Sequence, residues 1–297
     1  MRRFPSRALT LFVLALLVAL PALAEDDPSA KSSSSDTTAK SSSSDSDSWS
    51  DWRFQVAPYL WLFFIDGDVG SHGKQTGVHT SLFDLFQNTD TVLGVEVNMQ
   101  AQNGPWTLLV DPTWLRVTDS FDLGAGPLKV KGDITANVAL IDAMVLRELW
   151  HKDFGAPVVE KGMPRQGFTL DALGGMRATI IGGDLNLKVK PPGDLLDDIK
   201  HQWDATQNWV DPVIGARATI DCGRFEFIAR GDVGGFTIQS DITSEMWASA
   251  VYKFKMFGLD AGAAVGFRAL YDDYDADNGF LYKTWIYGPT IGMGFRF

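Results

Sequence analysis

The 297-residue sequence contains a single cysteine, Cys222, so an intramolecular disulfide cannot form and cysteine usage gives no information on the redox compartment. Although 45% of its residues are hydrophobic, the chain beyond its first residues has no apolar run long enough for a transmembrane helix. This absence does not exclude a membrane β-barrel, because barrel strands are short and alternate in polarity. The length allows one large β domain or two smaller ones.

Basic residues are also scarce. The chain has 26 Lys and Arg against 37 Asp and Glu, which gives a formal net charge of −11. This balance argues against a nucleic-acid partner. No motif predicts a cofactor, and we expect none.

The N-terminus has the pattern of a secretory signal peptide over residues 1–24. Arginines precede an apolar run from Ala8 to Leu20, and Ala22 and Ala24 form a small-x-small cleavage site. No cysteine follows this site to carry a lipid anchor. Residues 25–50, with two runs of four serines, have almost nothing to bury, and they predict a disordered periplasmic linker. The alternative is a tether that reaches toward the cell wall or a partner.

The C-terminal stretch Trp285–Phe297 alternates with a period of two. One face carries Trp285, Tyr287, Pro289, Ile291, Met293, Phe295 and Phe297, and the other is mostly small residues. Such alternation predicts a strand. Aromatic residues at both ends, with small residues on the second face, are typical of a lipid-facing barrel strand with a narrow lumen behind it.

This stretch resembles the C-terminal β-signal that the barrel-assembly machinery reads on outer-membrane proteins, with Thr290, Gly292, Phe295 and Phe297 as the matching residues. Over residues 52–297 the chain also looks like a family of uncharacterised proteobacterial outer-membrane β-barrel proteins. The segments that carry this likeness are 58–61, 65–70, 209–215 and 230–236. The resemblance implies the outer membrane of a Gram-negative bacterium, with lipid, lipopolysaccharide and the assembly machinery as partners. It implies no substrate.

Segments of barrel-strand length recur from Trp52 onward. We expect an all-β, transmembrane, antiparallel up-and-down β-barrel over residues 51–297, monomeric, with about ten strands and short loop helices. The predicted strands are 52–64, 92–101, 106–118, 133–150, 168–181, 209–221, 224–234, 242–254, 259–271 and 285–297. Eight to twelve strands are possible, and a further hairpin within 67–80 would make twelve. Short turns at 102–105, 221–223 and 255–258 alternate with longer outward connections at 66–90, 119–132, 182–208 and 272–279.

Charged residues lie on the strand faces opposite the apolar rows. They are Arg53, Glu96, Asp111, Asp171, Arg177, Asp211, Arg217, Glu226, Arg230, Asp232, Glu245, Arg268 and Arg296. A soluble sandwich would turn these faces to water, whereas a membrane barrel turns them inward. Six arginines against seven carboxylates favour mutual pairing in a filled lumen, because an unpaired charge in a narrow interior is costly. The alternative is a narrow porin-like channel with a selective charged lining.

Two connections have apolar residues at helical spacing, 81–87 behind a Ser cap and 191–203. We expect each to form a short loop helix.

None of the four histidines falls in a confidently predicted strand. His79, Ser81 and Asp84 contain the residue types of a catalytic triad, but their closeness in sequence alone does not establish one. We therefore expect no catalytic residues and no enzyme; a barrel enzyme acting on lipid or peptide is the second alternative. The acidic run 272–279 departs from a calcium loop and predicts a solvated outer loop rather than a metal site.

Overall fold

The computed structural model describes residues 52–71, 74–125, 128–154, 166–190 and 199–297. The predicted signal peptide and the linker of 25–50 lie outside these residues. The elements are β1 (Arg53–Trp61), β2 (Phe64–Ser71), β3 (Lys74–Ser81), α2 (Leu82–Asn88), β4 (Thr91–Asn103), β5 (Trp106–Ala125), β6 (Leu128–Asp153), β7 (Gly167–Lys190), β8 (Ile199–Cys222), β9 (Phe225–Gly234), β10 (Ile242–Met256), β11 (Leu259–Asp275) and β12 (Phe280–Arg296).

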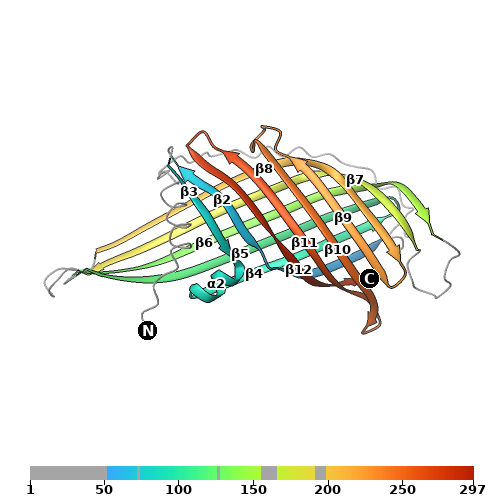
Figure 1. Ribbon diagram of the computed structural model, residues 1–297, viewed down its shortest axis with the longest axis horizontal. Helices are drawn as coiled ribbons and strands as arrows, with labels where there is room; N and C mark the ends of the chain where they lie inside the picture. The colour runs from blue at the N-terminus through green and yellow to red at the C-terminus, as the bar shows by residue number, and fades with distance from the viewer. Residues whose placement is uncertain (1–51, 72–73, 126–127, 155–165, 191–198) are drawn as a thin grey trace, which may run out of the picture.

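Ten antiparallel strands form a closed barrel, which confirms the predicted fold (Figure 1). β1 closes it by pairing with β4 on one side and β12 on the other. β2 continues along β12 directly after β1, and β3 pairs with β2, so these two strands are the additional hairpin within 67–80. The sheet therefore has twelve strands, ten of which enclose the lumen.

The short turns and the C-terminus lie at one end of the barrel, which we call the turn end (Figure 1). Gly104, between β4 and β5, has φ of 54°, and Gly223, between β8 and β9, has φ of 77°. These left-handed conformations suit glycine, because it has no Cβ to clash with the backbone. The tight turns predicted at 102–105 and 221–223 are confirmed.

The longer outward connections are predicted wrongly, because much of their length is strand. β5 and β6 remain paired from Trp106 as far as Ala125 and Leu128, and β7 and β8 pair from Gly167 as far as Val189 and Ile199. β6 has 26 residues, about 85 Å at roughly 3.3 Å per residue. β5 to β8 thus run far beyond the other strands at the end opposite the turns, the far end (Figure 1).

Toward the far end the interior is an apolar core. Its buried members come from opposite walls, with Val69 and Val78 on the β2–β3 hairpin and Ile181 and Leu185 on β7. Trp209 of β8 stacks on Tyr274 of β11 with ring centroids 4.2 Å apart and planes 4° from parallel. Here the barrel is filled by side chains from facing walls.

The helix predicted at 81–87 is confirmed as α2. Ser81 caps it by accepting a hydrogen bond from the backbone N–H of Asp84, whose carboxylate accepts in return from the Ser81 backbone N–H. The second predicted helix is wrong for 199–203, which belong to β8, and residues 191–198 lie outside the described chain. No helix in the described ranges is long and apolar enough to cross a membrane.

Candidate functional site

Seven charged side chains meet inside the barrel and form what we call the charge layer. They are Asp111 of β5, Asp142 of β6, Arg177 of β7, Arg230 and Asp232 of β9, Glu245 of β10 and Arg268 of β11. Each faces inward because it occupies the lumen side of a strand with a period of two. All seven are at most 8% exposed. The layer therefore joins three adjacent strands of the wall, β9, β10 and β11, with β5, β6 and β7.

Three arginines and four carboxylates are interleaved in this layer. Arg177 Nε lies 2.8 Å from Asp142 Oδ1, and its Nη2 lies 3.0 Å from Asp232 Oδ1. Arg268 Nη2 lies 2.8 Å from Glu245 Oε2, and Arg230 also contacts Glu245. The planar guanidinium lets each arginine reach more than one carboxylate, which compensates the desolvation of the charges.

Aromatic and polar side chains complete the layer. The Arg268 guanidinium carbon lies 4.6 Å from the Trp61 ring centroid and 5.3 Å from that of Trp247. Tyr59 donates a hydrogen bond of 2.7 Å to Asp111, and Asn98 donates another of 2.7 Å to the second Asp111 oxygen. Cation–π contacts and neutral donors thus surround the ion pairs, leaving the lumen filled at this level.

On the far-end side of the layer, one hydroxyl joins two buried carboxylates. Ser240 contacts Asp211 through both its backbone N–H, at 2.9 Å, and its Oγ. The same Oγ lies 3.2 Å from Asp272 Oδ1, and Trp209 Nε1 donates to Asp272 Oδ2 at 3.2 Å. Asp272, predicted in a solvated loop, is only 2% exposed, so that prediction is wrong for this residue.

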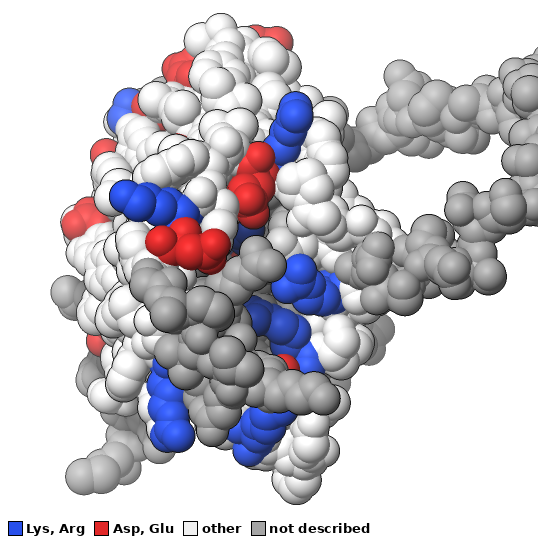
Figure 2. Space-filling view, turned by 90° about the vertical axis from the view of Figure 1, so that its right-hand side faces the viewer, with Lys and Arg blue, Asp and Glu red and all other residues white. Residues whose placement is uncertain are grey.

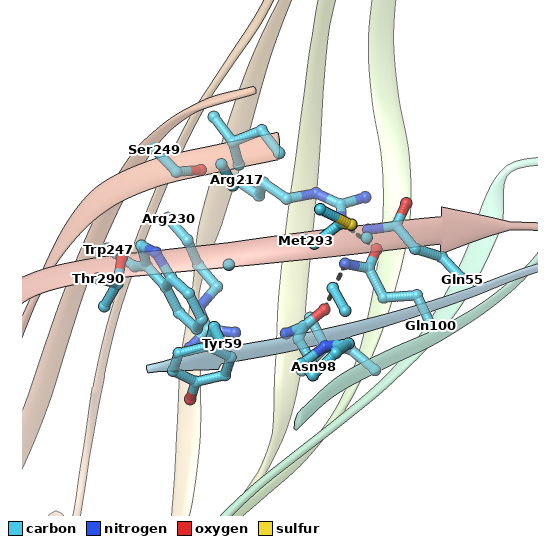
Figure 3. Close-up of a pocket in the computed structure, with 17 residues that line it drawn as sticks. Gln55, Tyr59, Asn98, Gln100, Arg217, Arg230, Trp247, Ser249, Thr290 and Met293 are labelled. Atoms are coloured by element: carbon cyan, nitrogen blue, oxygen red, sulfur yellow. Dashed lines mark hydrogen bonds between the residues drawn. The ribbon is translucent and has the colours of Figure 1, made fainter. Parts of the chain in front are cut away.

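On the turn-end side of the layer lies a small cavity of about 100 Å³, which we call the inner cavity (Figure 3). Tyr59, Arg230 and Trp247 form its boundary with the layer. Amides line it further out: Gln100 donates a 2.8 Å hydrogen bond to Asn98 and accepts one of 3.0 Å from Arg217. Figure 3 shows these groups converging on the same space.

The inner cavity continues into a larger cavity of about 670 Å³ at the turn end, which we call the vestibule. Gln55, Ala57, Ala264 and Gly294 line both. The charged residues of the vestibule are Arg53, Arg224, Glu226, Lys253, Lys255, Asp260 and Arg296. Figure 2 looks at the turn end and shows both basic and acidic side chains on this face.

The thirteen predicted lumen charges are thus distributed over the length of the barrel. Six belong to the charge layer, namely Asp111, Arg177, Arg230, Asp232, Glu245 and Arg268, and Asp211 lies beyond it. Nearer the turn end, Asp171 lies 2.8 Å from Arg217, Glu226 lies 2.8 Å from Lys253, and Arg296 donates to Gln55 at 3.0 Å. Arg53 lines the vestibule. Glu96 accepts from the backbone N–H of Trp61, where β1 separates from β4.

Sequence reasoning missed Asp142, which contacts all three arginines of the layer. Its inward neighbours Leu140, Met144 and Leu146 are apolar, so both faces of β6 look alike and the facing is ambiguous. The sequence signal that could have identified Asp142 was its position as a carboxylate within a long apolar strand. Asp221 and Lys253, which form an ion pair with each other, and Asp272, which accepts a hydrogen bond from Thr179, were likewise not predicted.

The proposed assembly-signal residues occupy the end of β12 and the residue after it. Thr290 faces the lumen and is buried, whereas Phe297 is 62% exposed and stacks on Phe54 at 6.1 Å. A Cβ on Gly292 would lie 2.7 Å from that of Tyr59, so glycine gives Tyr59 its room beside the charge layer. Recognition of these residues by the assembly machinery stays a prediction.

The histidines lie in strands more often than predicted. His79 is in β3, His151 in β6 and His201 in β8, while His72 lies outside the described residues. His79 Nδ1 lies 3.0 Å from Asp66 Oδ1, whereas Ser81 binds Asp84 in the helix cap. His79, Ser81 and Asp84 therefore do not form a hydrogen-bonded triad. Within the described ranges, no group of three or more His, Cys, Asp or Glu residues is placed to hold a metal ion.

The sequence matches no protein-family model and no curated protein. Among the solved structures that are similar to it are three outer-membrane proteins. The outer membrane protease OmpT from Escherichia coli gives a TM-score of 0.38 at 10% identity, over 83% of this chain and 97% of that chain. Ail, the attachment invasion locus protein of Yersinia pestis, gives a TM-score of 0.27 at 8% identity, over 83% of this chain and 98% of that chain. The P. putida toluene transporter TodX gives a TM-score of 0.24 at 8% identity, over 83% of this chain and 89% of that chain. Such low scores carry no functional argument.

Proposed function

We propose that this protein is an outer-membrane β-barrel of a Gram-negative bacterium, with a lumen closed by the charge layer and a structural or surface-interaction role. The closed lumen is supported by one observation above all. Seven charged side chains from six strands meet with at most 8% exposure, between the vestibule and the apolar core. A hydrated pore would leave such charges accessible to water.

The membrane location is supported by the outward faces of the strands. On β12, Tyr287, Ile291 and Met293 are 36%, 54% and 36% exposed, and Trp285 and Phe297 flank them. Phe297 lies ten positions after Tyr287, about 33 Å along the strand, or roughly 25 Å in height at the usual barrel tilt. This is the height of the apolar band in outer-membrane barrels.

The partners follow from the same surface. Lipid and lipopolysaccharide would contact the exposed apolar band, and the assembly machinery would bind the last strand by β-augmentation, with Phe295 and Phe297 adding specificity. A single closed barrel needs no second copy to complete its wall, which favours a monomer. The turn end would face the periplasm, because short turns lie there in outer-membrane barrels.

A narrow channel for small solutes is the second candidate. The vestibule of about 670 Å³ and the inner cavity favour it, because together they open much of the lumen from the turn end. Swelling of proteoliposomes in small sugars tests both candidates. A closed barrel gives the swelling rate of liposomes alone, whereas swelling that depends on folded protein would establish the channel.

We also propose that the protein is not an enzyme. In support, Ser81 and His79 have separate carboxylate partners, and His151 is bound by Thr169 at 2.8 Å and Asp153 at 3.0 Å. Hydrolysis of phospholipid and peptide substrates by the folded protein is the test. Turnover that disappears in His79→Ala or His151→Ala would contradict the proposal.

A further inference from the structure

The vestibule has an excess of positive charge in a protein that is acidic overall. Five basic residues line it, against the two acidic residues Glu226 and Asp260. The chain as a whole has a formal net charge of −11. A concave basic site in an acidic molecule focuses the field on the space it encloses and attracts anions there.

Two of the five basic residues already have carboxylate partners. Lys253 binds Asp221 and lies 2.8 Å from Glu226, and Lys255 lies 3.4 Å from Asp260. The other three are arginines. Among the described residues, no carboxylate lies within 4.0 Å of Arg53, Arg224 or Arg296. Within the described residues, the positive charge of these three arginines is therefore not neutralised by an ion pair.

Two of the arginines lie on paired strands of the wall, and the third lies farther around it, beyond β10 and β11. Arg53 is at the start of β1, Arg296 at the end of β12, and Arg224 in the turn before β9. Gln55 accepts a 3.0 Å hydrogen bond from Arg296 Nη2. This bond uses one N–H group of the guanidinium. Gln55 pairs with Arg296 in the β1–β12 register, so the closure of the barrel itself sets this position.

We propose that the vestibule is a binding site for an organic anion that carries two or more carboxylate or phosphate groups. The guanidinium fork matches both groups with two parallel N–H···O bonds. The volume is that of a small-molecule site, and Val251, Ala261 and Ala264 supply an apolar wall between the charges. The ligand enters from the turn end and stops at the inner cavity.

Calorimetric titration of the refolded full chain in a zwitterionic detergent tests this site, with citrate as the carboxylate probe and pyrophosphate as the phosphate probe. We expect saturable binding of at least one probe, weakened by salt because the contacts are ionic. Which probe binds more tightly identifies the anionic group. Each of Arg53→Gln, Arg224→Gln and Arg296→Gln should weaken binding about tenfold or more, the effect of one charged hydrogen bond.

Arg147→Gln is the matched control, because Arg147 lies on the outside of the wall, 5.2 Å from the Trp106 ring centroid. It removes the same charge and should leave the affinity unchanged. No saturable heat with either probe, full affinity in the triple arginine variant, or an equal loss in Arg147→Gln would each overturn the proposal. Heat-modifiable gel mobility verifies that every variant is folded.

The chain's own residues 25–51 carry seven acidic residues and two lysines, so the test has to separate an external anion from this segment. A second protein with those seven residues changed to Asn and Gln should bind the probe at least as tightly as the natural chain. Binding seen only in that protein would overturn an external anion as the occupant and assign the vestibule to the segment. The titration does not require a closed lumen, so it can fail or succeed independently of the proposed function.

Discussion

Glu245 Oε2 accepts a 2.8 Å contact from Arg268 Nη2, and each of these side chains is only 1% exposed. The same carboxylate contacts Arg177 at 3.2 Å and also contacts Arg230. Glu245, like Asp142, thus contacts all three buried arginines. We therefore expect loss of the Glu245 carboxylate to disturb the charge layer more than loss of any single ion pair within it.

Glu245→Gln should lower the free energy of unfolding by about 3–5 kcal/mol, the usual cost of leaving buried charge without its partner. Urea unfolding in detergent, followed by gel mobility, measures this loss. Asp260→Asn is the control, because its ion pair with Lys255 is solvent-exposed and should contribute less than about 1 kcal/mol. Equal losses in the two variants would show that the charge layer does not stabilise the barrel.

Val265→Arg should destabilise the protein in lipid by about 2–4 kcal/mol, the cost of a basic residue on a barrel's lipid face near the midplane. Val265 is 60% exposed on the outside of β11. Phe257→Arg, in the turn before β11, should cost no more than about 1 kcal/mol, because that turn lies outside the apolar band. Unfolding in lipid vesicles compares the two. If Val265→Arg were neutral, its environment would be water, and the membrane assignment would fail.

Trp209→Ala should lower the free energy of unfolding by about 3–5 kcal/mol. The indole is 1% exposed, stacks on Tyr274 and donates to Asp272, so its removal leaves a cavity and takes one hydrogen-bond donor from a buried carboxylate. Hydrogen exchange should increase in β11 and β12 near Tyr274 and Phe280. Trp285→Ala, which removes a half-exposed tryptophan from the outer face, should not increase it there.

Ser240→Ala should cost about 1–3 kcal/mol, because the hydroxyl that joins Asp211 and Asp272 is lost in a fully buried site. Ser249→Ala, in the wall of the inner cavity, should change stability by less than about 0.5 kcal/mol. Chemical unfolding of both variants gives the comparison. A neutral Ser240→Ala would mean that the two carboxylates are satisfied without this bridge.

Phe297→Ala should reduce the amount of heat-modifiable protein in the outer membrane of cells several-fold, because the terminal aromatic of the proposed assembly signal is lost. Refolding of the same variant in detergent should proceed as for the natural chain, since Phe297 is 62% exposed and contributes little to the core. Cell fractionation and refolding yield separate the two effects. Normal insertion in cells would contradict the assembly-signal assignment.

The barrel could be predicted because its outward face has a strict period of two. Trp106, Leu108 and Val110 of β5 and Ile291 and Met293 of β12 are exposed as the alternation requires. Gly104 and Gly223 marked tight turns in the sequence, and these turns predicted two of the hairpins. These signals are local, so a single sequence is sufficient to find them.

Beyond the apolar band the same reasoning failed, because strands there are polar on the outside and face other strands across the interior rather than lipid. Residues such as Trp203 and Asp272 therefore resembled loop residues although they lie in β8 and β11. The charge layer was partly predictable, since inward charges are visible strand by strand. Their grouping was not, because it depends on register: Arg177 meets Asp142 across one strand pair but reaches Glu245 across the lumen.

The most direct test of the closed lumen is single-channel recording of the refolded full chain in a planar bilayer, with folding verified by heat-modifiable mobility. We predict no conductance steps from folded protein, because the charge layer and the apolar core fill the lumen in series. Steady, charge-selective steps that change with Arg217→Ala, a substitution at the wall of the inner cavity, would contradict the account and establish a pore.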